Sequence, residues 1–176
     1  MADDLVTVVI AARGGDREAF AELYRRFHRA VHGVVLARAP YLDAADLVQD
    51  TFALALARIA QLGDAAAFPG WLLAIARNRA IDHLRGSKPT DELPELPVEA
   101  PRRAEVAQVL TALRALPEAY HETIILRLVE GMSGPEIAEQ TGLSAGSVRV
   151  NLHRGMKLLR EKLGITTKEG SDEQVG

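Results

Sequence analysis

Residues 86–101, GSKPTDELPELPVEAP, limit the fold of this chain more than any other feature. The segment holds four prolines and four acidic residues and shows no helical period, which is typical of a linker between domains. Fully extended, such a segment reaches roughly 50 Å, whereas a flexible chain of this length averages about 20 Å. The parts on either side can therefore contact well-separated sites on one large partner.

Both flanking parts are predicted to be helical. Val, Ile and aromatic residues recur at intervals of three and four and never alternate over the length of a strand. Helices are expected near 16–38, 43–60, 69–85, 102–115, 117–130, 133–141 and 144–163. The predicted fold is all-α and has five parts: an N-terminal segment (1–15), a helical domain (16–85), a flexible linker (86–101), a second helical domain (102–163) and a disordered tail (164–176).

Several helix ends carry local signals. Asp43 suits the N-cap of the second helix, and Pro69 suits the first turn of the third. Ser133 and Glu136 have the spacing of a capping box, and Gly142 suits the turn between the last two helices.

Composition excludes several classes of protein. With 48% hydrophobic and 26% charged residues the chain is not intrinsically disordered, and no apolar run approaches the roughly 18 residues of a membrane span. The acidic start MADD differs from the basic start of a signal peptide, so we expect a cytoplasmic protein without membrane insertion. No cysteine is present, and the five histidines lack metal-ligand spacing. The chain also has no phosphate loop, nucleophile–base pair or carboxylate cluster, so we expect no metal, cofactor, small-molecule substrate or catalysis.

The last predicted helix concentrates basic charge. Residues 144–163 hold five Lys or Arg and one acid, whereas the whole chain holds 21 and 24. A short helix, a glycine turn and this longer helix, capped by Ser144, have the helix-turn-helix form. In that motif the second helix enters the major groove, which would aim Ser147, Arg149, Val150, Asn151 and Arg154 at DNA. The alternative is a solvated basic face on an ordinary bundle helix.

The helix predicted at 43–60 carries two different faces. Its buried stripe is expected to be Val48, Phe52, Leu56 and Ile59, and its other side Asp46, Leu47, Asp50 and Leu54. An exposed surface that mixes acids with large aliphatic residues suits docking on a basic protein partner. The alternative is a bundle helix that is buried on two sides.

The next segment, FPGWLLAIARNRAIDHLR, places Trp71 and Ile75 on one face with Asn78 and Asp82, and Arg79 lies beside them. Aromatic side chains interleaved with amide and guanidinium donors suit single-stranded nucleic acid, because flat rings stack on bases and cations attract phosphate. A core tryptophan with a polar rim is the alternative.

Taken in order, LDAADLVQDTFALALARIAQL, then FPGWLLAIARNRAIDHLR, then LRALPEAYHETIILRLVEGMSGPEIAEQTGLSAGSVRVNLHRGMKLLREKL closely resemble the group 4, extracytoplasmic-function sigma factors of bacterial RNA polymerase. The resemblance extends from about residue 16 to residue 163. It implies a subunit that binds core polymerase through the β′ coiled coil and the β flap, directs it to promoter DNA, and is held by an anti-sigma factor.

The resemblance also implies roles for individual residues. In the family, the segment like DLVQDTF is region 2.2, which docks on the β′ coiled coil; the matching residues are Asp46, Leu47, Gln49, Asp50 and Leu54. The following loop and helix resemble regions 2.3 and 2.4, which melt and read the −10 element; the matching residues are Gly63, Asp64, Phe68, Trp71, Arg77, Asn78 and Arg79.

The C-terminal part resembles region 4, which reads the duplex −35 element. The residues implied there are Ser144, Ser147, Arg149, Val150, Asn151, His153, Arg154 and Lys157. This helix departs from the common family pattern of Lys or Arg, then Ser, then Arg, because it reads Arg149, Val150, Asn151. Val150 offers an apolar contact such as a thymine methyl group, and Asn151 best suits adenine.

A different function for the same motif is a free-standing helix-turn-helix transcription regulator. The run EGMSGPEIAEQTGLSAGSVRVNLHRG also resembles the DNA-binding domain of response-regulator activators. Against this reading, the first half offers no βα alternation of a receiver domain and no ligand-binding sheet.

Overall fold

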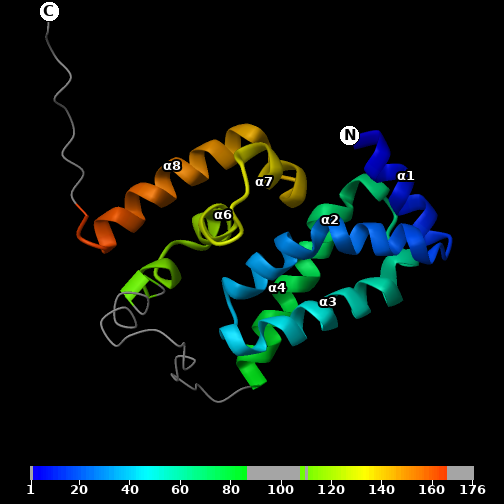
Figure 1. Cartoon of the computed structure of the whole chain (residues 1–176), viewed down its shortest axis with the longest axis horizontal. Coiled ribbons are helices and arrows are strands. Elements are labelled where there is room, and N and C mark those ends of the chain that lie inside the picture. The colour runs from blue at the N-terminus through cyan, green and yellow to red at the C-terminus, as the bar shows by residue number, and fades with distance from the viewer. Residues whose placement is uncertain (1, 87–107, 110, 166–176) are drawn as a thin grey trace, which may run out of the picture.

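The computed structural model describes residues 2–86, 108–109 and 111–165, and in this part of the chain every regular element is helical (Figure 1). The α-helices are α1 (Ala2–Arg13), α2 (Arg17–Leu36), α3 (Ala44–Arg58), α4 (Phe68–Gly86), α6 (Glu118–Leu128), α7 (Gly134–Thr141) and α8 (Ala145–Lys162). Short 3-10 turns are η1 (Tyr41–Asp43), η2 (Ile59–Gln61) and η3 (Ala65–Ala67). The all-α prediction is confirmed.

Two predictions fall largely outside the described residues. These are the linker at 86–101, apart from residue 86, and the tail at 164–176, apart from residues 164 and 165. Of the helix predicted at 102–115, residues 108, 109 and 111–114 are described and helical.

Helix α1 occupies a segment for which the sequence predicted no helix. Its β-branched run Thr7–Ile10 has only modest helix propensity. Val9 and Ala12 are buried in the core formed with the next three helices. Tertiary packing, rather than local propensity, therefore explains this helix.

Most of the predicted helix ends are confirmed. The Ser133 hydroxyl accepts from the backbone N–H of Glu136, whose carboxylate accepts from the backbone N–H of Ser133, so α7 begins with a complete capping box. Gly142 ends α7 at φ 74°, in the left-handed region where glycine is favoured. The Ser144 hydroxyl then caps α8 by accepting from the backbone N–H of Ser147.

One predicted helix cap has the predicted position but not the predicted hydrogen bond. Asp43 stands at the N-cap position of α3, yet its side chain makes no capping hydrogen bond. The carboxylate instead lies 2.9 Å from Nε2 of His83, near the end of α4. Asp43 thus links the start of α3 to the end of α4.

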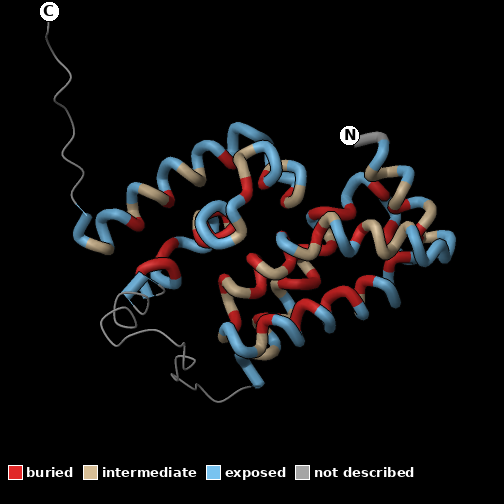
Figure 2. Tube along the Cα trace, in the orientation of Figure 1, coloured by how far each residue is buried: buried red, intermediate tan, exposed pale blue. Residues whose placement is uncertain are grey.

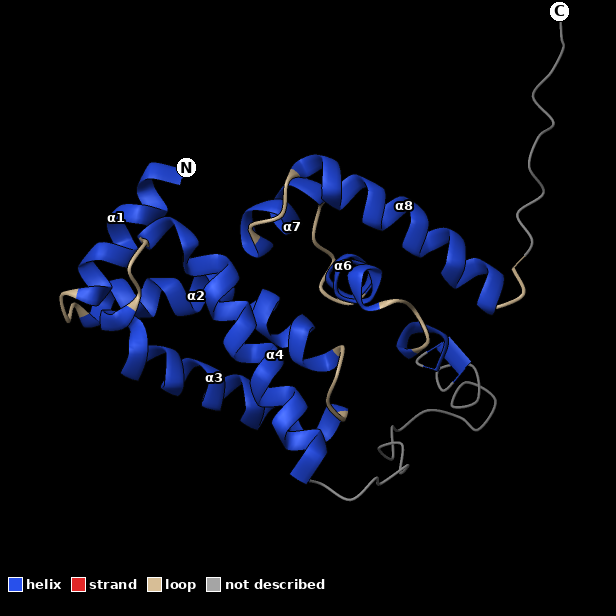
Figure 3. Cartoon of the chain, turned by 180° about the vertical axis from the view of Figure 1, so that it is seen from behind, coloured by secondary structure: helices blue, strands red, loops and turns tan. Residues whose placement is uncertain are grey.

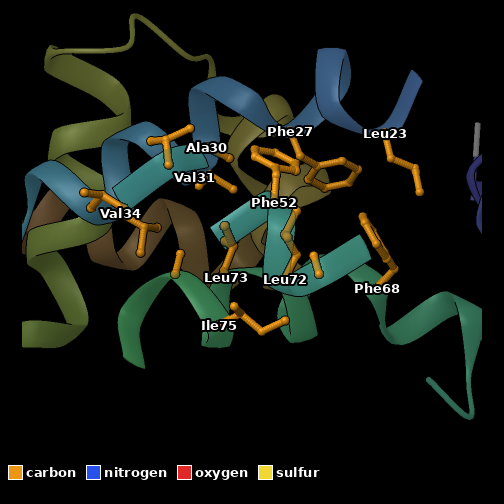
Figure 4. Close-up of a cluster of buried hydrophobic side chains, with 14 of the residues drawn as sticks. Leu23, Phe27, Ala30, Val31, Val34, Phe52, Phe68, Leu72, Leu73 and Ile75 are labelled. Carbon is orange, nitrogen blue, oxygen red and sulfur yellow. The ribbon is translucent and has the colours of Figure 1, made fainter. Parts of the chain in front are cut away.

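Helices α1 to α4 enclose the main hydrophobic core. Figure 4 shows Phe27, Phe52, Phe68 and Leu72 pointing into the space between α2, α3 and α4. The Phe27 and Phe68 rings meet edge to face with centroids 5.3 Å apart, a favourable aromatic arrangement. Figure 2 shows that the buried positions of these helices lie on their facing sides.

A smaller core holds the second helical set together. It joins α6 and α8 through Ile124 and Leu159, together with Leu113 and Leu116. Gly155 permits this close packing, because a β-carbon there would lie only 2.7 Å from Cγ1 of Ile124.

The second helical set also packs on the first. Helix α6 lies between α8 and the first set, as Figures 1 and 3 both show, and α7 contacts α2 and α4. Leu126, Met132, Ile137 and Val148 of the second set are buried in the same cluster as the core of the first. The two predicted domains therefore share an apolar interface in this structure.

Candidate functional site

The outer face of α3 differs from the prediction at two leucines. Asp46, Gln49 and Asp50 are exposed, as the docking hypothesis requires. Leu47, however, is only 4% exposed and belongs to the core, while Leu56, assigned to the buried stripe, is 53% exposed. The core is formed with α2 and α4 on neighbouring sides of α3, so the buried arc of α3 is rotated from the predicted one.

Leu54 is partly buried against the same core. The exposed outer face of α3 is therefore more polar than the sequence suggested. It consists of Asp46, Gln49 and Asp50, with part of Leu54 accessible at its edge.

Asp50 of α3 and Arg79 of α4 form an ion pair that no local sequence pattern indicated. Arg79 Nη2 donates to Asp50 Oδ2 at 2.7 Å, and both side chains are more than a third exposed. The Arg79 Nε is buried and has no hydrogen-bond partner among the described residues. A residue predicted to dock on polymerase thus forms an ion pair with a residue predicted to read the −10 element.

The loop before α4 presents small and polar groups at the surface. Gly63 and Asp64 are exposed, and the Asp64 carboxylate accepts from the backbone N–H of Ala66 at 2.9 Å, which fixes the turn η3. Arg13 of α1 donates from Nη1 to the backbone carbonyl of Gly63 at 3.5 Å. Helix α1 therefore supports the loop that the sequence assigned to DNA melting.

Phe68 cannot form part of a DNA surface in this conformation, which corrects that prediction. Its side chain is fully buried against Phe27. Trp71 lies beside it with ring centroids 5.9 Å apart and remains partly accessible. Of these two aromatic side chains, only Trp71 is therefore accessible from outside, and it packs on the buried Phe68.

Asn78 and Arg77 have different surroundings on α4. The Asn78 side chain is exposed. Arg77 instead donates from Nε and Nη2 to the two carboxylate oxygens of Glu122 on α6, at 2.7 and 3.0 Å. This bidentate hydrogen bond to the carboxylate raises the pKa of Arg77.

Helix α8 presents an exposed basic row. Its exposed members are Arg149, Val150, His153, Arg154 and Lys157. No carboxylate among the described residues pairs with the arginines or the lysine of this row. Free cations with an apolar residue between them are suited to phosphate and base-edge contacts in a major groove.

At the start of α8, the hydroxyl groups of Ser144 and Ser147 are hydrogen-bonded to each other. Ser144 Oγ and Ser147 Oγ lie 2.9 Å apart, and Ser144 also accepts from the Ser147 backbone. Both residues are exposed, so they can still meet a phosphate at the helix N-terminus.

Asn151 lies at the side of α8 that faces the first helical set. It lines a cavity of about 330 Å³ together with Arg38, in the turn after α2, and Arg77 of α4. One residue predicted to read −35 DNA and one predicted to read −10 DNA therefore share one cavity.

Sequence reasoning missed the acidic residues of α6 that make this contact. Arg38 Nη1 lies 2.6 Å from the carboxylate of Glu122. Arg38 Nη2 donates to the carboxylate of Glu118 at 2.7 Å, and this second hydrogen bond lowers the pKa of Glu118. The only available signal was the spacing of four residues between Glu118 and Glu122, which is typical of any solvated helix face.

The described residues contain no group of three or more His, Cys, Asp or Glu side chains placed to hold a metal ion. Within the same residues, no helix combines the length and the apolar character needed to cross a bilayer.

Comparison with known proteins gives matches over both helical sets. Residues 23–90 match the family described as Sigma-70 region 2, and residues 107–159 match the family described as Sigma-70, region 4. The chain is 34% identical over 163 residues to the RNA polymerase sigma factor CarQ of Myxococcus xanthus, covering 86% of this chain and 93% of CarQ. It is 31% identical over 156 residues to the ECF RNA polymerase sigma factor SigM of Mycobacterium tuberculosis, covering 85% of this chain and 80% of SigM.

A solved structure is similar over nearly the whole chain. The structure of CnrH in complex with the cytosolic domain of CnrY has a TM-score of 0.62 at 27% identity, covering 93% of this chain and 99% of the matched chain.

Proposed function

The chain belongs to the extracytoplasmic-function sigma factors of bacterial RNA polymerase, which direct promoter-specific transcription, and we propose that it does so through three surfaces of its own. The first is the outer face of α3, which docks on core polymerase. The second is the surface of the η3 loop and α4, which opens and reads the −10 element. The third is the basic row of α8, which reads the −35 duplex.

The observation that carries this proposal is the row Arg149, Val150 and Arg154 on the second helix of a helix-turn-helix, exposed and without carboxylate partners among the described residues. Arginines can donate to guanine O6 and N7 or to phosphates, and Val150 can contact a thymine methyl group. Asn151 adds adenine preference once it leaves the cavity beside Arg77.

The docking surface rests on Asp46, Gln49 and Asp50, because these side chains are exposed on one face of α3. The role of Leu47 changes from contact to support, since its burial holds α3 on the core beneath these carboxylates. Complementary charge on a basic partner would add to association rate and specificity.

The −10 surface combines Gly63 and Asp64 of the loop with Trp71, Asn78 and Arg79 of α4. Extruding a base costs a few kcal/mol, and stacking on an aromatic ring with hydrogen bonds to the base edge offsets that cost. The buried Phe68 keeps Trp71 in place for this task. Binding alone accomplishes these steps, so the chain needs no catalytic group of its own.

An anti-sigma factor is the proposed regulatory partner. CnrH, which the chain resembles in fold, is seen in complex with the cytosolic domain of CnrY. We propose that the chain acts in the cytoplasm, where it binds core polymerase. Its two domains are residues 16–85 and 102–163, and residues 86–101 are the linker between them.

The docking surface is tested by Asp50→Arg, which reverses charge on the α3 face. We expect its affinity for core polymerase to fall roughly tenfold or more, as when like charges meet across an interface. Asp82→Arg is the matched control, because Asp82 is an exposed carboxylate of α4 outside the proposed surface. Equal core affinity for the wild type and Asp50→Arg would refute this assignment.

The −35 surface is tested by Arg154→Ala. We expect promoter binding by the holoenzyme to weaken by about 1–3 kcal/mol if Arg154 contacts a base, with core affinity intact. Lys162→Ala, an exposed basic residue in the last turn of the same helix, serves as the control. Unchanged discrimination between promoters in Arg154→Ala would contradict the proposed reading surface.

A further inference from the structure

Helix α1 lies outside both segments of the chain that match the sigma factor families, because the first match begins at residue 23. None of the three proposed surfaces includes this helix. It is nevertheless a fixed part of the fold, since Val9 and Ala12 are buried in the main core. What α1 contacts at the surface therefore bears on what the helix does.

Both ends of α1 are bonded to other parts of the first helical set. Near its start, the carboxylate of Asp4 accepts from Nη1 of Arg26 on α2 at 2.6 Å. At its last residue, Nη1 of Arg13 donates to the backbone carbonyl of Gly63 in a long hydrogen bond of 3.5 Å. The helix lies along α2 and also contacts η2 and η3, which flank this carbonyl on both sides (Figure 1). Helix α1 thus connects α2 to the loop between α3 and α4.

That loop has two buried anchors and an exposed tip. Leu62 and Ala65 are each only 7% exposed and belong to the same core as α1. Gly63 and Asp64, which we call the loop tip, lie between these anchors and are exposed. The Asp64 carboxylate caps η3 and so fixes the side of the tip that leads into α4. The side of the tip that faces α1 is bonded through Gly63.

Steric contacts do not fix the backbone at Gly63. A β-carbon built there would meet no heavy atom within 4 Å beyond its chain neighbours. Glycine also has access to more backbone conformations than any other residue. The direction of the Gly63 carbonyl therefore depends on hydrogen bonding, and Arg13 is a donor to it. This bond restricts the peptide plane that joins the two residues of the loop tip.

We propose that α1 positions the loop tip for the −10 element and that Arg13 is the positioning residue. By holding the Gly63 carbonyl, Arg13 keeps the tip in one conformation before DNA arrives. A tip that is already ordered loses less conformational freedom when an extruded base binds, so more of the binding free energy is retained. Arg13 thereby contributes to selectivity at the −10 element without contacting a base. This role of Arg13 rests on the proposed −10 function of the loop.

Arg13→Ala in the holoenzyme tests the effect on DNA. Opening is followed by the fluorescence of 2-aminopurine in the non-template strand of the −10 element. We expect discrimination between the preferred −10 element and one with a single substituted base to fall about two- to tenfold, the effect of losing one ordinary hydrogen bond. Core affinity and −35 discrimination should not change. Arg17→Ala, an exposed arginine at the start of α2, is the matched control, and Arg13→Lys should restore much of the discrimination because lysine can also donate to the carbonyl.

Amide hydrogen exchange in the free chain tests the positioning itself, without DNA. The backbone N–H of Ala66 donates to the Asp64 carboxylate at 2.9 Å, and that of Ala67 donates to the Asp64 carbonyl at 3.1 Å. Both amides report on the order of the loop. Arg13→Ala should speed their exchange about two- to tenfold, whereas the amide of Leu72, inside the core part of α4, should exchange as in the wild type.

Three results would overturn the role of Arg13. These are unchanged exchange of the loop amides, unchanged −10 discrimination in Arg13→Ala, and an equal loss in core affinity and at both promoter elements, which would indicate a general structural effect. Asn78→Ala tests the proposed −10 surface separately. If Asn78→Ala leaves −10 discrimination unchanged while Arg13→Ala still speeds exchange, the proposed function of this surface fails, and Arg13 is a structural support only.

Discussion

Replacing Gly155 with alanine should destabilise the helix-turn-helix, although alanine is the better helix former. The added β-carbon would lie 2.7 Å from Cγ1 and 3.0 Å from Cδ1 of Ile124, and 3.0 Å from the β-carbon of Tyr120. Carbon atoms prefer about 3.5–4.0 Å. Ile124 is fully buried, and its Cγ1 is bonded directly to the β-carbon, so this atom cannot move far unless α6 itself moves. Helices α6 and α8 must therefore move apart.

The magnitude follows from two opposing effects. Forced overpacking of a well-packed core costs about 1–3 kcal/mol, whereas exchanging glycine for alanine inside a helix gains about 1 kcal/mol. Gly146→Ala is the matched control, because Gly146 is in the same helix and its nearest atom would be the Ser144 hydroxyl oxygen at 3.9 Å. The propensity gain largely cancels between the two variants, so their free energies of unfolding should differ by about 1–3 kcal/mol.

The assay is urea unfolding followed by far-ultraviolet circular dichroism. Gly146→Ala should be equal to or more stable than the wild type, and Gly155→Ala should be the less stable of the two. Equal free energies of unfolding for the two variants would refute the packing argument.

Three further predictions concern stability. Burial lowers the pKa of His121 below its ordinary value of 6.5, so the unfolded chain binds the proton first; the free energy of unfolding should fall as pH drops below 6.5, and His121→Gln should flatten that slope in urea titrations. Ser144→Ala removes the acceptor for the backbone N–H of Ser147 and should cost about 1 kcal/mol in the same assay, and an unchanged midpoint would refute the cap. The exposed pair of Asp50 and Arg79 should show a coupling of about 0.2–1 kcal/mol in a double-mutant cycle, and a larger value would show that it is more than a surface pair.

Features set by neighbouring residues could be predicted from the sequence. The capping box of Ser133 and Glu136 and the left-handed Gly142 follow from local chemistry, and both appear in the structure. The exposed basic row of α8 also follows locally, because its period of 3.6 separates the cations from Val148 and Leu159.

Features set by distant packing could not be predicted. Leu47 is buried and Leu56 is exposed, the reverse of the prediction, because α2 and α4 pack on neighbouring sides of α3 and rotate its buried arc from the predicted stripe. Helix α1 forms because Val9 is buried by residues far along the chain. The pairing of Arg77 with Glu122 joins residues 45 positions apart, and no local pattern specifies it.

The candidate site was therefore predictable in part. The sequence identified the segments that carry the three surfaces, but not which of their side chains are accessible. Phe68 illustrates the difference, because an aromatic residue at the edge of a loop can stack on a base or fill the core, and here it fills the core.

This chain gives core RNA polymerase the ability to select promoters. Run-off transcription from a library of promoter-containing DNA, with purified core polymerase and with or without the chain, measures this directly. We predict initiation from a restricted set of templates only when the chain is present, and loss of that selectivity with Arg154→Ala. Failure of the chain to bind core, or the same transcripts from core alone, would contradict the account.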